Sequence, residues 1–209
     1  MVTSRSGVVM VTLVLAACSG QFAYAPPAPV VPTVNSVVIN RPRDEVWKGV
    51  VPHLAQSFFV INNLDLASGL MNVSYSGDPE RFVDCGRITS HVSNLAGPRT
   101  YDFPAARASQ AYEVMQNDKL YRIERTLSLD GRTNIVFEEV NSTTTRVTVN
   151  VRYVLTKQSH VQQAGTGTPQ DFAETISFNS GQSDVFRRSQ ITTCRPTGEL
   201  ERQVLDLIK

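Results

Sequence analysis

The clearest pattern along the chain is the alternation of apolar and polar residues between Asp118 and Leu155. A period of two predicts β-strands with one buried and one solvent-facing side. The apolar residues on both sides of Asp130-Gly131 occupy odd-numbered positions, namely Tyr121, Ile123, Leu127, Leu129, Ile135 and Phe137. If odd-numbered residues face each other in a hairpin, the residue numbers of each facing pair add up to an even number. We therefore expect a three-residue loop, with Gly131 in the left-handed conformation and a bulge. A long strand follows, with apolar Val147, Val149, Val151, Tyr153 and Leu155.

Shorter strand patterns lie on either side of this region. Residues 37–39 predict a short first strand. A hairpin is expected from residues 59–62 and 69–75, with its turn at Asn63-Leu64-Asp65. The remaining expected strands cover residues 81–88, 172–179 and 185–194, and the last of these is the ninth in the chain.

Two stretches are poorly patterned and contain Gly and Pro, namely residues 93–117 and 158–171. Such segments favour mobile surface loops. Within the first of them, residues 105–115 favour a short helix. The sequence assigns neither stretch a role.

The sequence predicts two amphipathic helices. The first begins near Pro42, and its apolar stripe is Val46, Val50 and Leu54. Trp47 lies beside this stripe, which favours a core position over stacking on a ligand. Pro52 removes one helical hydrogen bond and predicts a kink or an early end.

The second helix opens at Pro196-Thr197 and has its apolar stripe at Leu200, Val204, Leu207 and Ile208. The antiparallel hairpins have one solvent-facing side and one apolar side that must be buried. The apolar stripes of the two helices can pack against that side. The expected fold is therefore of the α+β class, a curved antiparallel sheet with two helices packed on one face.

The N-terminus has the features of a secretory signal. Residues 8–16 form an apolar run that is too short to span a bilayer, and small residues follow it. Leu15-Ala16-Ala17-Cys18 resembles the lipobox of bacterial lipoprotein precursors. The resemblance implies cleavage after Ala17 and fatty acyl groups, such as palmitate, on Cys18. Ser19 follows where an inner-membrane retention signal has Asp, which implies a lipid anchor at the periplasmic face of the outer membrane. The alternative is an ordinary secreted protein.

These features divide the chain into a signal peptide (1–17), a lipidated Pro-rich tether (18–36) and one α+β domain (37–209). Pro26, Pro27, Pro29 and Pro32 favour an extended tether. The full chain carries 20 Lys and Arg against 19 Asp and Glu, and cleavage removes only Arg5. A neutral chain without a basic run excludes general attraction to nucleic acid. No second apolar run is long enough to span a membrane.

Cys85 and Cys194 remain as an even pair in an exported chain, so we expect them to form a disulfide in an oxidising periplasm. The alternative is a reactive or metal-binding thiol, but neither cysteine has a His or a second Cys at ligand spacing.

No cluster of residues points to catalysis, and we expect neither an enzyme nor a bound metal or cofactor. His53, His91 and His160 are dispersed and lack acidic residues or cysteines at ligand spacing. Glu138 and Glu139 point to opposite faces of a strand, so they do not form an acid–base pair. The sequence contains no nucleophile elbow, phosphate-binding loop or zincin motif.

Residues 43–54 (RDEVWKGVVPHL), 59–61 and 66–75 (LASGLMNVSY) resemble the helix-grip repeats of BamC, an outer-membrane lipoprotein of the β-barrel assembly machine. The resemblance covers about a quarter of the mature chain and implies a single helix-grip domain with no catalytic residue.

Anchor, tether and resemblance together predict a non-enzymatic lipoprotein that acts as a scaffold or accessory subunit of an envelope assembly or secretion complex. Its expected partners are the membrane, through the lipid on Cys18, and an envelope protein complex. The alternative is a periplasmic carrier of lipid or another hydrophobic ligand that uses a cleft between sheet and helix.

Overall fold

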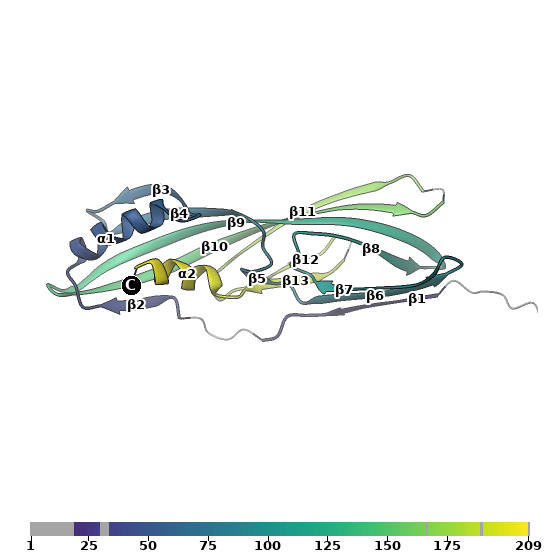
Figure 1. Ribbon diagram of the computed structural model, residues 1–209, viewed down its shortest axis with the longest axis horizontal. Coiled ribbons are helices and arrows are strands. Elements are labelled where there is room, and N and C mark those ends of the chain that lie inside the picture. The colour runs from purple at the N-terminus through teal and green to yellow at the C-terminus, as the bar shows by residue number, and fades with distance from the viewer. Residues whose placement is uncertain (1–18, 30–33, 166, 189, 209) are drawn as a thin grey trace, which may run out of the picture.

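The computed structural model describes residues 19–29, 34–165, 167–188 and 190–208. They form an elongated body through which two long antiparallel strands run (Figure 1). These strands are β9 (Lys119–Asn141) and β10 (Thr144–Gln163), which pair continuously from Glu139–Thr145 to Tyr121–Gln163. At about 3.3 Å per residue, the 23 residues of β9 extend over roughly 70 Å.

Shorter strands flank this central pair in a seven-stranded antiparallel sheet. Strands β2, β3 and β4 lie at one end of it, and β8 and β11 lie toward the other. Two three-stranded sheets complete the described strands, in the orders β1-β6-β7 and β12-β13-β5. The bounds are β1 (Ser19–Ala25), β2 (Ser36–Ile39), β3 (Val60–Asp65), β4 (Leu70–Gly77), β5 (Val83–Asp84), β6 (Arg87–Asn94), β7 (Gly97–Pro104), β8 (Ser109–Gln116), β11 (Gln170–Asn179), β12 (Asp184–Phe186) and β13 (Thr192–Pro196).

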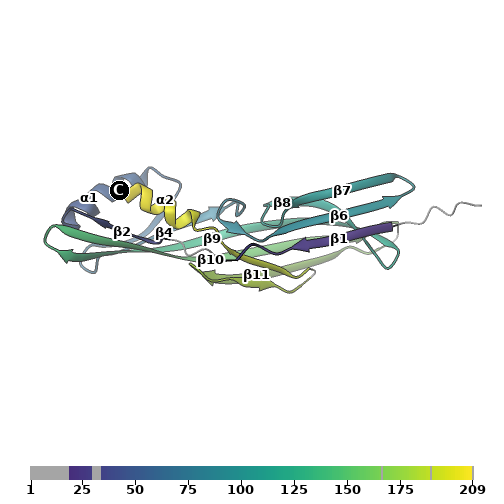
Figure 2. The same ribbon diagram turned by 90° about the horizontal axis from the view of Figure 1, so that it is seen from below.

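The helices α1 (Arg43–Ala55) and α2 (Glu199–Ile208) lie at the end with β2, β3 and β4, which we call the helical end (Figure 2). The Trp47 ring packs edge-on against Phe137, with 5.1 Å between their centroids. Leu200 lies over the backbone of Gly131. Phe137 and Gly131 are both on the buried, odd-numbered face of β9, so the two helices cover the same face. The predicted α+β class, antiparallel strands with two short helices, is confirmed.

The opposite end, which we call the β1 end, has two layers of strands. The sheet β1-β6-β7 lies against the buried face of β8 and β9 (Figure 2). Ile88 and Val92 of β6 are fully buried between the layers, and the Phe103 ring of β7 packs on Tyr112 of β8 at 5.1 Å. The hydrophobic core therefore continues from the helices to the far end of the body.

The expected hairpin at Asp130-Gly131 is wrong, because β9 runs through both residues without a turn. Gly131 is there for a different reason. A Cβ atom on this residue would lie 2.8 Å from the Leu200 Cδ2 atom, and Leu200 is fully buried. The glycine allows α2 to approach the sheet closely, and the real turn lies between Asn141 and Thr144.

The two expected loops are also largely wrong. Residues 93–117 contain the end of β6, the whole of β7 and the whole of β8, and residues 105–115 form no helix. Of the expected loop 158–171, residues 158–163 belong to β10 and residues 170–171 belong to β11. Alternation in β7 and β8 is weak because β7 is an edge strand and few of its side chains are buried.

Smaller corrections concern boundaries. Asn63-Leu64-Asp65 belongs to β3, and the turn lies at residues 66–69, where Asp65 accepts hydrogen bonds from Ala67 and Ser68. Helix α1 continues through Pro52 and ends at Ala55. The expected last strand, 185–194, is divided into β12 and β13. In all, the described part of the chain has thirteen strands instead of the nine expected.

The expected tether is partly a strand. Residues 19–25 form β1, which pairs with β6 from Ser19–Ser93 to Ala25–Arg87. Tyr24 secures this strand, because its hydroxyl donates to the Cys85 carbonyl at 3.0 Å and accepts from the Thr193 backbone N–H at 2.9 Å. Gly86, with φ of +77°, lets the chain at Ala25 and Pro26 pass against it. Residues 1–18, including the predicted signal peptide and Cys18, lie outside the described residues.

The expected disulfide between Cys85 and Cys194 is present. Cys85 follows β5 and Cys194 lies in β13, and both side chains are fully buried. The bond joins segments 109 residues apart at the middle of the body, next to the entry of α2.

Replacing both cysteines, Cys85→Ala with Cys194→Ala, should lower the free energy of unfolding by about 4 kcal/mol, because a long closed loop restricts the unfolded chain. Urea unfolding of the oxidised wild type and the double variant measures this loss. Reduced wild type is the control and should match the variant. Equal midpoints for the oxidised protein and the variant would contradict the structural role.

Candidate functional site

The residues that sequence analysis singled out do not meet in one place. Each described histidine has a separate partner for its Nδ1 atom: the Leu207 carbonyl for His53, the Thr100 hydroxyl for His91 and the Asp171 carboxylate for His160. Among the described residues, no group of three or more His, Cys, Asp or Glu is placed to hold a metal ion.

Glu138, considered above for an acid–base pair, and Asp84, which directly precedes Cys85, both have structural partners. Glu138 pairs with Arg146 at 3.3 Å on the exposed face of the sheet. Asp84 accepts from the Gly86 backbone at 2.9 Å and pairs with Arg195 at 3.2 Å. These contacts position the polypeptide and leave no acid–base pair facing a cavity.

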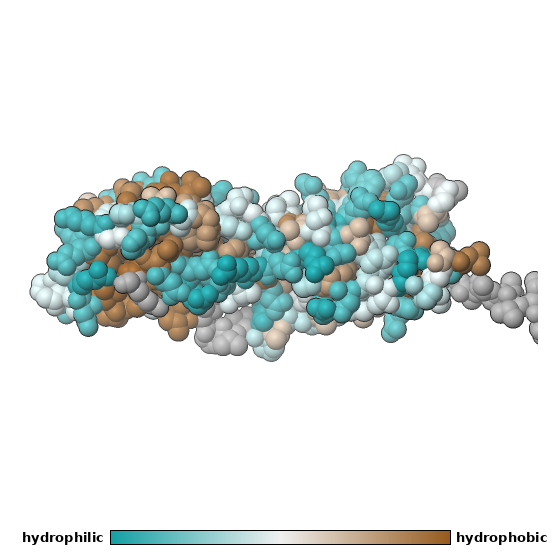
Figure 3. Space-filling model, in the orientation of Figure 1, coloured by the Kyte–Doolittle hydropathy of each residue, from teal (hydrophilic) through white to brown (hydrophobic). Residues whose placement is uncertain are grey.

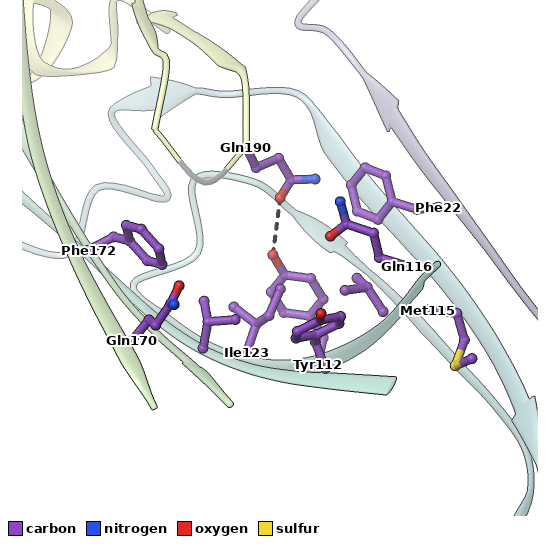
Figure 4. A pocket seen from close by; sticks show the side chains of 11 residues that line it. Phe22, Tyr112, Met115, Gln116, Ile123, Gln170, Phe172 and Gln190 are labelled. Atoms are coloured by element: carbon purple, nitrogen blue, oxygen red, sulfur yellow. Dashed lines mark hydrogen bonds between the residues drawn. The ribbon is translucent and has the colours of Figure 1, made fainter. Parts of the chain in front are cut away.

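A cleft at the β1 end has a volume of about 560 Å³. Its lining comes from β1, β8, β9, β10, β11 and the segment before β13, and none of it from α1 or α2. Figure 4 shows Phe22 and Phe172 on opposite sides, Ile123 and Tyr112 below, and Gln190 above.

Most of the cleft wall is apolar. Ile123 and Val161 face each other across β9 and β10, and Tyr112 of β8 lies beside Ile123. Phe172 of β11 and Phe22 of β1 close the sides. The side chains of Gln116, Gln170 and Gln190 add neutral hydrogen-bonding groups.

The inner end of the cleft is formed by a hydrogen bond from the Tyr112 hydroxyl to Gln190 Oε1 at 3.1 Å. Beyond it, the buried face of the sheet carries two cations. Arg125 occupies the next inward position of β9 after Ile123, and Lys157 of β10 pairs with Leu127, the position after that. Each residue is only 4% exposed.

Arg125 is poorly compensated. Its Nη2 atom donates to the Arg107 carbonyl at 3.3 Å, its guanidinium lies 5.7 Å from the Phe103 ring centroid, and its Nε atom has no hydrogen-bond partner among the described residues. Burial lowers the pKa of Arg125 and raises the pKa of Tyr112, and each group opposes the shift of the other.

Lys157 is held by backbone oxygens. Its Nζ atom donates to the carbonyls of Arg188 and Gln190, each at 3.2 Å, and lies 4.5 Å from the Phe186 ring centroid. Burial lowers the pKa of Lys157 to about 8. The negative charge of Glu174 opposes this shift, and the positive charge of Arg125 adds to it. The Glu174 carboxylate accepts the backbone N–H groups of Arg187 and Arg188 at 2.7 and 2.8 Å.

Another buried polar group lies under α2. Glu201 is fully buried and accepts hydrogen bonds from the hydroxyls of Tyr153 and Ser180, each at 2.6 Å. Burial and the nearby carboxylate raise the pKa of Tyr153. This network ties α2 to the sheet, so we regard it as structural.

Sequence analysis missed Arg125 and Lys157. The signal was present, because both residues fall at odd-numbered positions, in phase with the buried face of their strands. The alternation predicts apolar residues at these buried positions. A charged residue there is unusual, because burying a charge without a partner is unfavourable. Phe22 and Tyr112 were missed because one was assigned to the tether and the other to a loop.

The geometry defines a class: an elongated, disulfide-bonded α+β protein with mostly antiparallel strands and an apolar cleft remote from its helices. Comparison with family models, curated proteins and solved structures finds no match to this chain. Within the described residues, no helix is both long and apolar enough to cross a bilayer.

The buried Lys157 should make stability depend on pH. The folded chain releases this proton near pH 8, whereas the unfolded chain holds it to about 10.5. Between these values the unfolded state binds more protons, so the contribution of Lys157 to the free energy of unfolding rises with pH, by up to about 3 kcal/mol. Below pH 8 that contribution is constant and unfavourable.

Urea unfolding at pH 7.5 and pH 10 tests this dependence, with Lys157→Met as the reference because it lacks the titrating group. Wild type should gain more stability than the variant over this interval. Identical changes in both proteins would show that Lys157 keeps an ordinary pKa in the folded state.

Proposed function

We propose that this protein is a non-enzymatic lipoprotein of the outer membrane that acts as a scaffold or accessory subunit of an envelope assembly or secretion complex. The observation that carries the proposal is the gathering of exposed apolar side chains at the helical end, some 70 Å along β9 from the β1 end. Large exposed apolar patches on soluble proteins mark interaction sites.

The apolar surface of the helical end includes Phe58, Val60, Leu64 and Leu66, which lie in or beside β3. Val60 is 62% exposed and Phe58 is 52% exposed. Brown, apolar surface covers much of this end in Figure 3. Among the described strands, β3 pairs with β4 alone, so its other edge is available to a partner strand.

The β1 end suits a lipid anchor. Ser19, directly after Cys18, pairs with Ser93 at the tip of β6, so an acyl group on Cys18 would lie at that tip. The turn between β6 and β7 carries Leu95, whose side chain is 91% exposed. An apolar side chain beside the attachment point favours contact with a bilayer surface.

The helix-grip resemblance is part of the same proposal. Residues 43–54, which carry it, form α1, and Trp47 within them packs on the sheet at Phe137. A curved antiparallel sheet with helices on one face supports a BamC-like arrangement. The β1 end, with its two layers of strands, lies outside the residues that carry this resemblance. It extends the body toward the proposed anchor.

Lipidation is tested by growing cells with an alkyne analogue of palmitate. Wild type should incorporate the label and sediment with outer membranes, whereas Cys18→Ser should do neither, because the thioether attachment is lost. The double variant Cys85→Ala with Cys194→Ala is the control and should keep the label. An unlabelled wild type, or a labelled Cys18→Ser, contradicts the anchor.

The partner surface is tested by placing a photo-crosslinking amino acid at Phe58 in living cells. We expect an adduct with an envelope protein that falls about tenfold in the variant Val60→Lys with Leu64→Lys, because two charges replace exposed apolar contacts. Ile191→Lys is the control, since Ile191 is about as exposed as Val60 but lies outside the helical end. An adduct that survives the double variant, or no envelope protein adduct, contradicts the proposal.

A further inference from the structure

We propose that the cleft at the β1 end binds one free long-chain fatty acid, with its carboxylate at the inner end near Tyr112 and Gln190 and its alkyl chain along the apolar walls. This site is separate from the partner surface of the helical end and does not depend on the scaffold proposal.

The walls suit an alkyl chain. Phe22, Val114, Ile123, Val161 and Phe172 surround the cleft from five different strands. Phe22 is 39% exposed although it lies on the face of β1 that turns toward β8. The volume, about 560 Å³, is in the range of roughly 300–1,000 Å³ that small-molecule sites have.

The inner end suits an anion. Tyr112 and Gln190 provide a hydroxyl and an amide at the boundary between the cleft and the buried cations. Lys157 Nζ donates to the backbone of Gln190, so the residue that closes the cleft also contacts a cation. Arg125 acts electrostatically on Tyr112 from the neighbouring inward position.

The positive charge there is only partly balanced, because one carboxylate, that of Glu174, acts on Lys157. No ion pair of the described residues includes Arg125 or Lys157. Glu174, whose charge acts on Lys157, directs both carboxylate oxygens to backbone N–H groups. Buried charges without partners are costly, because the low dielectric of the interior replaces water. A ligand carboxylate at the inner end would offset this cost.

This positive charge favours a free fatty acid as the ligand over an acyl group attached to Cys18. An acyl group attached through Cys18 is an ester or amide and carries no negative charge, so it would leave the charge of Arg125 without a carboxylate partner. A free fatty acid supplies both the alkyl chain and the carboxylate. The order of the site, apolar along its length and cationic behind its inner end, matches this amphiphile.

Binding is tested with the full chain carrying Cys18→Ser, which has no lipid of its own, by displacement of a fluorescent fatty acid. Palmitate should compete at least tenfold more strongly than hexadecanol, which has the same chain length but no charge. Equal competition by the two ligands would overturn the role of the cations. No binding of either would overturn the site.

Variants locate the site. Val161→Gln places an amide in the apolar wall at a half-buried position and should weaken palmitate binding about tenfold or more, whereas Val140→Gln, a matched change at the helical end, should leave it unaltered. Unchanged binding by Val161→Gln would place the ligand elsewhere and overturn the proposal.

Arg125→Met should remove most of the preference for palmitate over hexadecanol while leaving hexadecanol binding in place. If this variant does not fold, two measurements still test the proposal. They are the comparison of the two ligands on the Cys18→Ser chain and the effect of Val161→Gln. Failure of any of these tests leaves the anchor and the partner surface untouched, because the chain used here carries no lipid and no partner.

Discussion

The pairing of β9 with β10 is the constraint on which the rest of the structure depends. Each of the two strands contributes about twenty residues to one continuous ladder, with the odd-numbered side chains of both strands on the buried face. A one-residue slip would turn every buried side chain to solvent, so the register is strongly determined. Every other strand of the large sheet pairs directly or through β4 with this ladder, and both helices pack on its buried face.

Because the ladder is so long, its buried face is covered by different elements at its two ends. At the helical end it is covered by Trp47 and Leu200, which close the core, and the apolar residues left exposed lie around β3. At the β1 end the cover is another sheet, and the two layers leave a cleft at their margin. The disulfide between Cys85 and Cys194 lies between these regions and holds β13, and through it α2, to the segment that enters β6.

The two ends also differ in how they treat buried charge. Under α2, Glu201 is satisfied by two hydroxyl groups, which is the usual solution for a buried carboxylate. Near the cleft, Arg125 and Lys157 rely on backbone carbonyls and aromatic rings, and neither is paired with an acid. Such a difference within one core is expected when one region serves packing and the other serves binding, since functional sites carry the departures from the rules of stability.

Elements with a local signal could be predicted from the amino-acid pattern alone. The alternation of residues 147–155, the stripes of both helices and the pairing of the only two cysteines after Cys18 predicted a strand, two helices and a disulfide that are present. The remaining features depend on contacts between residues that are far apart in the chain. Gly131 reads as a turn in sequence, but its function is to admit Leu200 from a helix 69 residues later. Strands β1, β7 and β8 have little periodicity because their burial depends on partners distant in the chain, and the cleft they form brings Phe22, Tyr112 and Gln190 together only after folding.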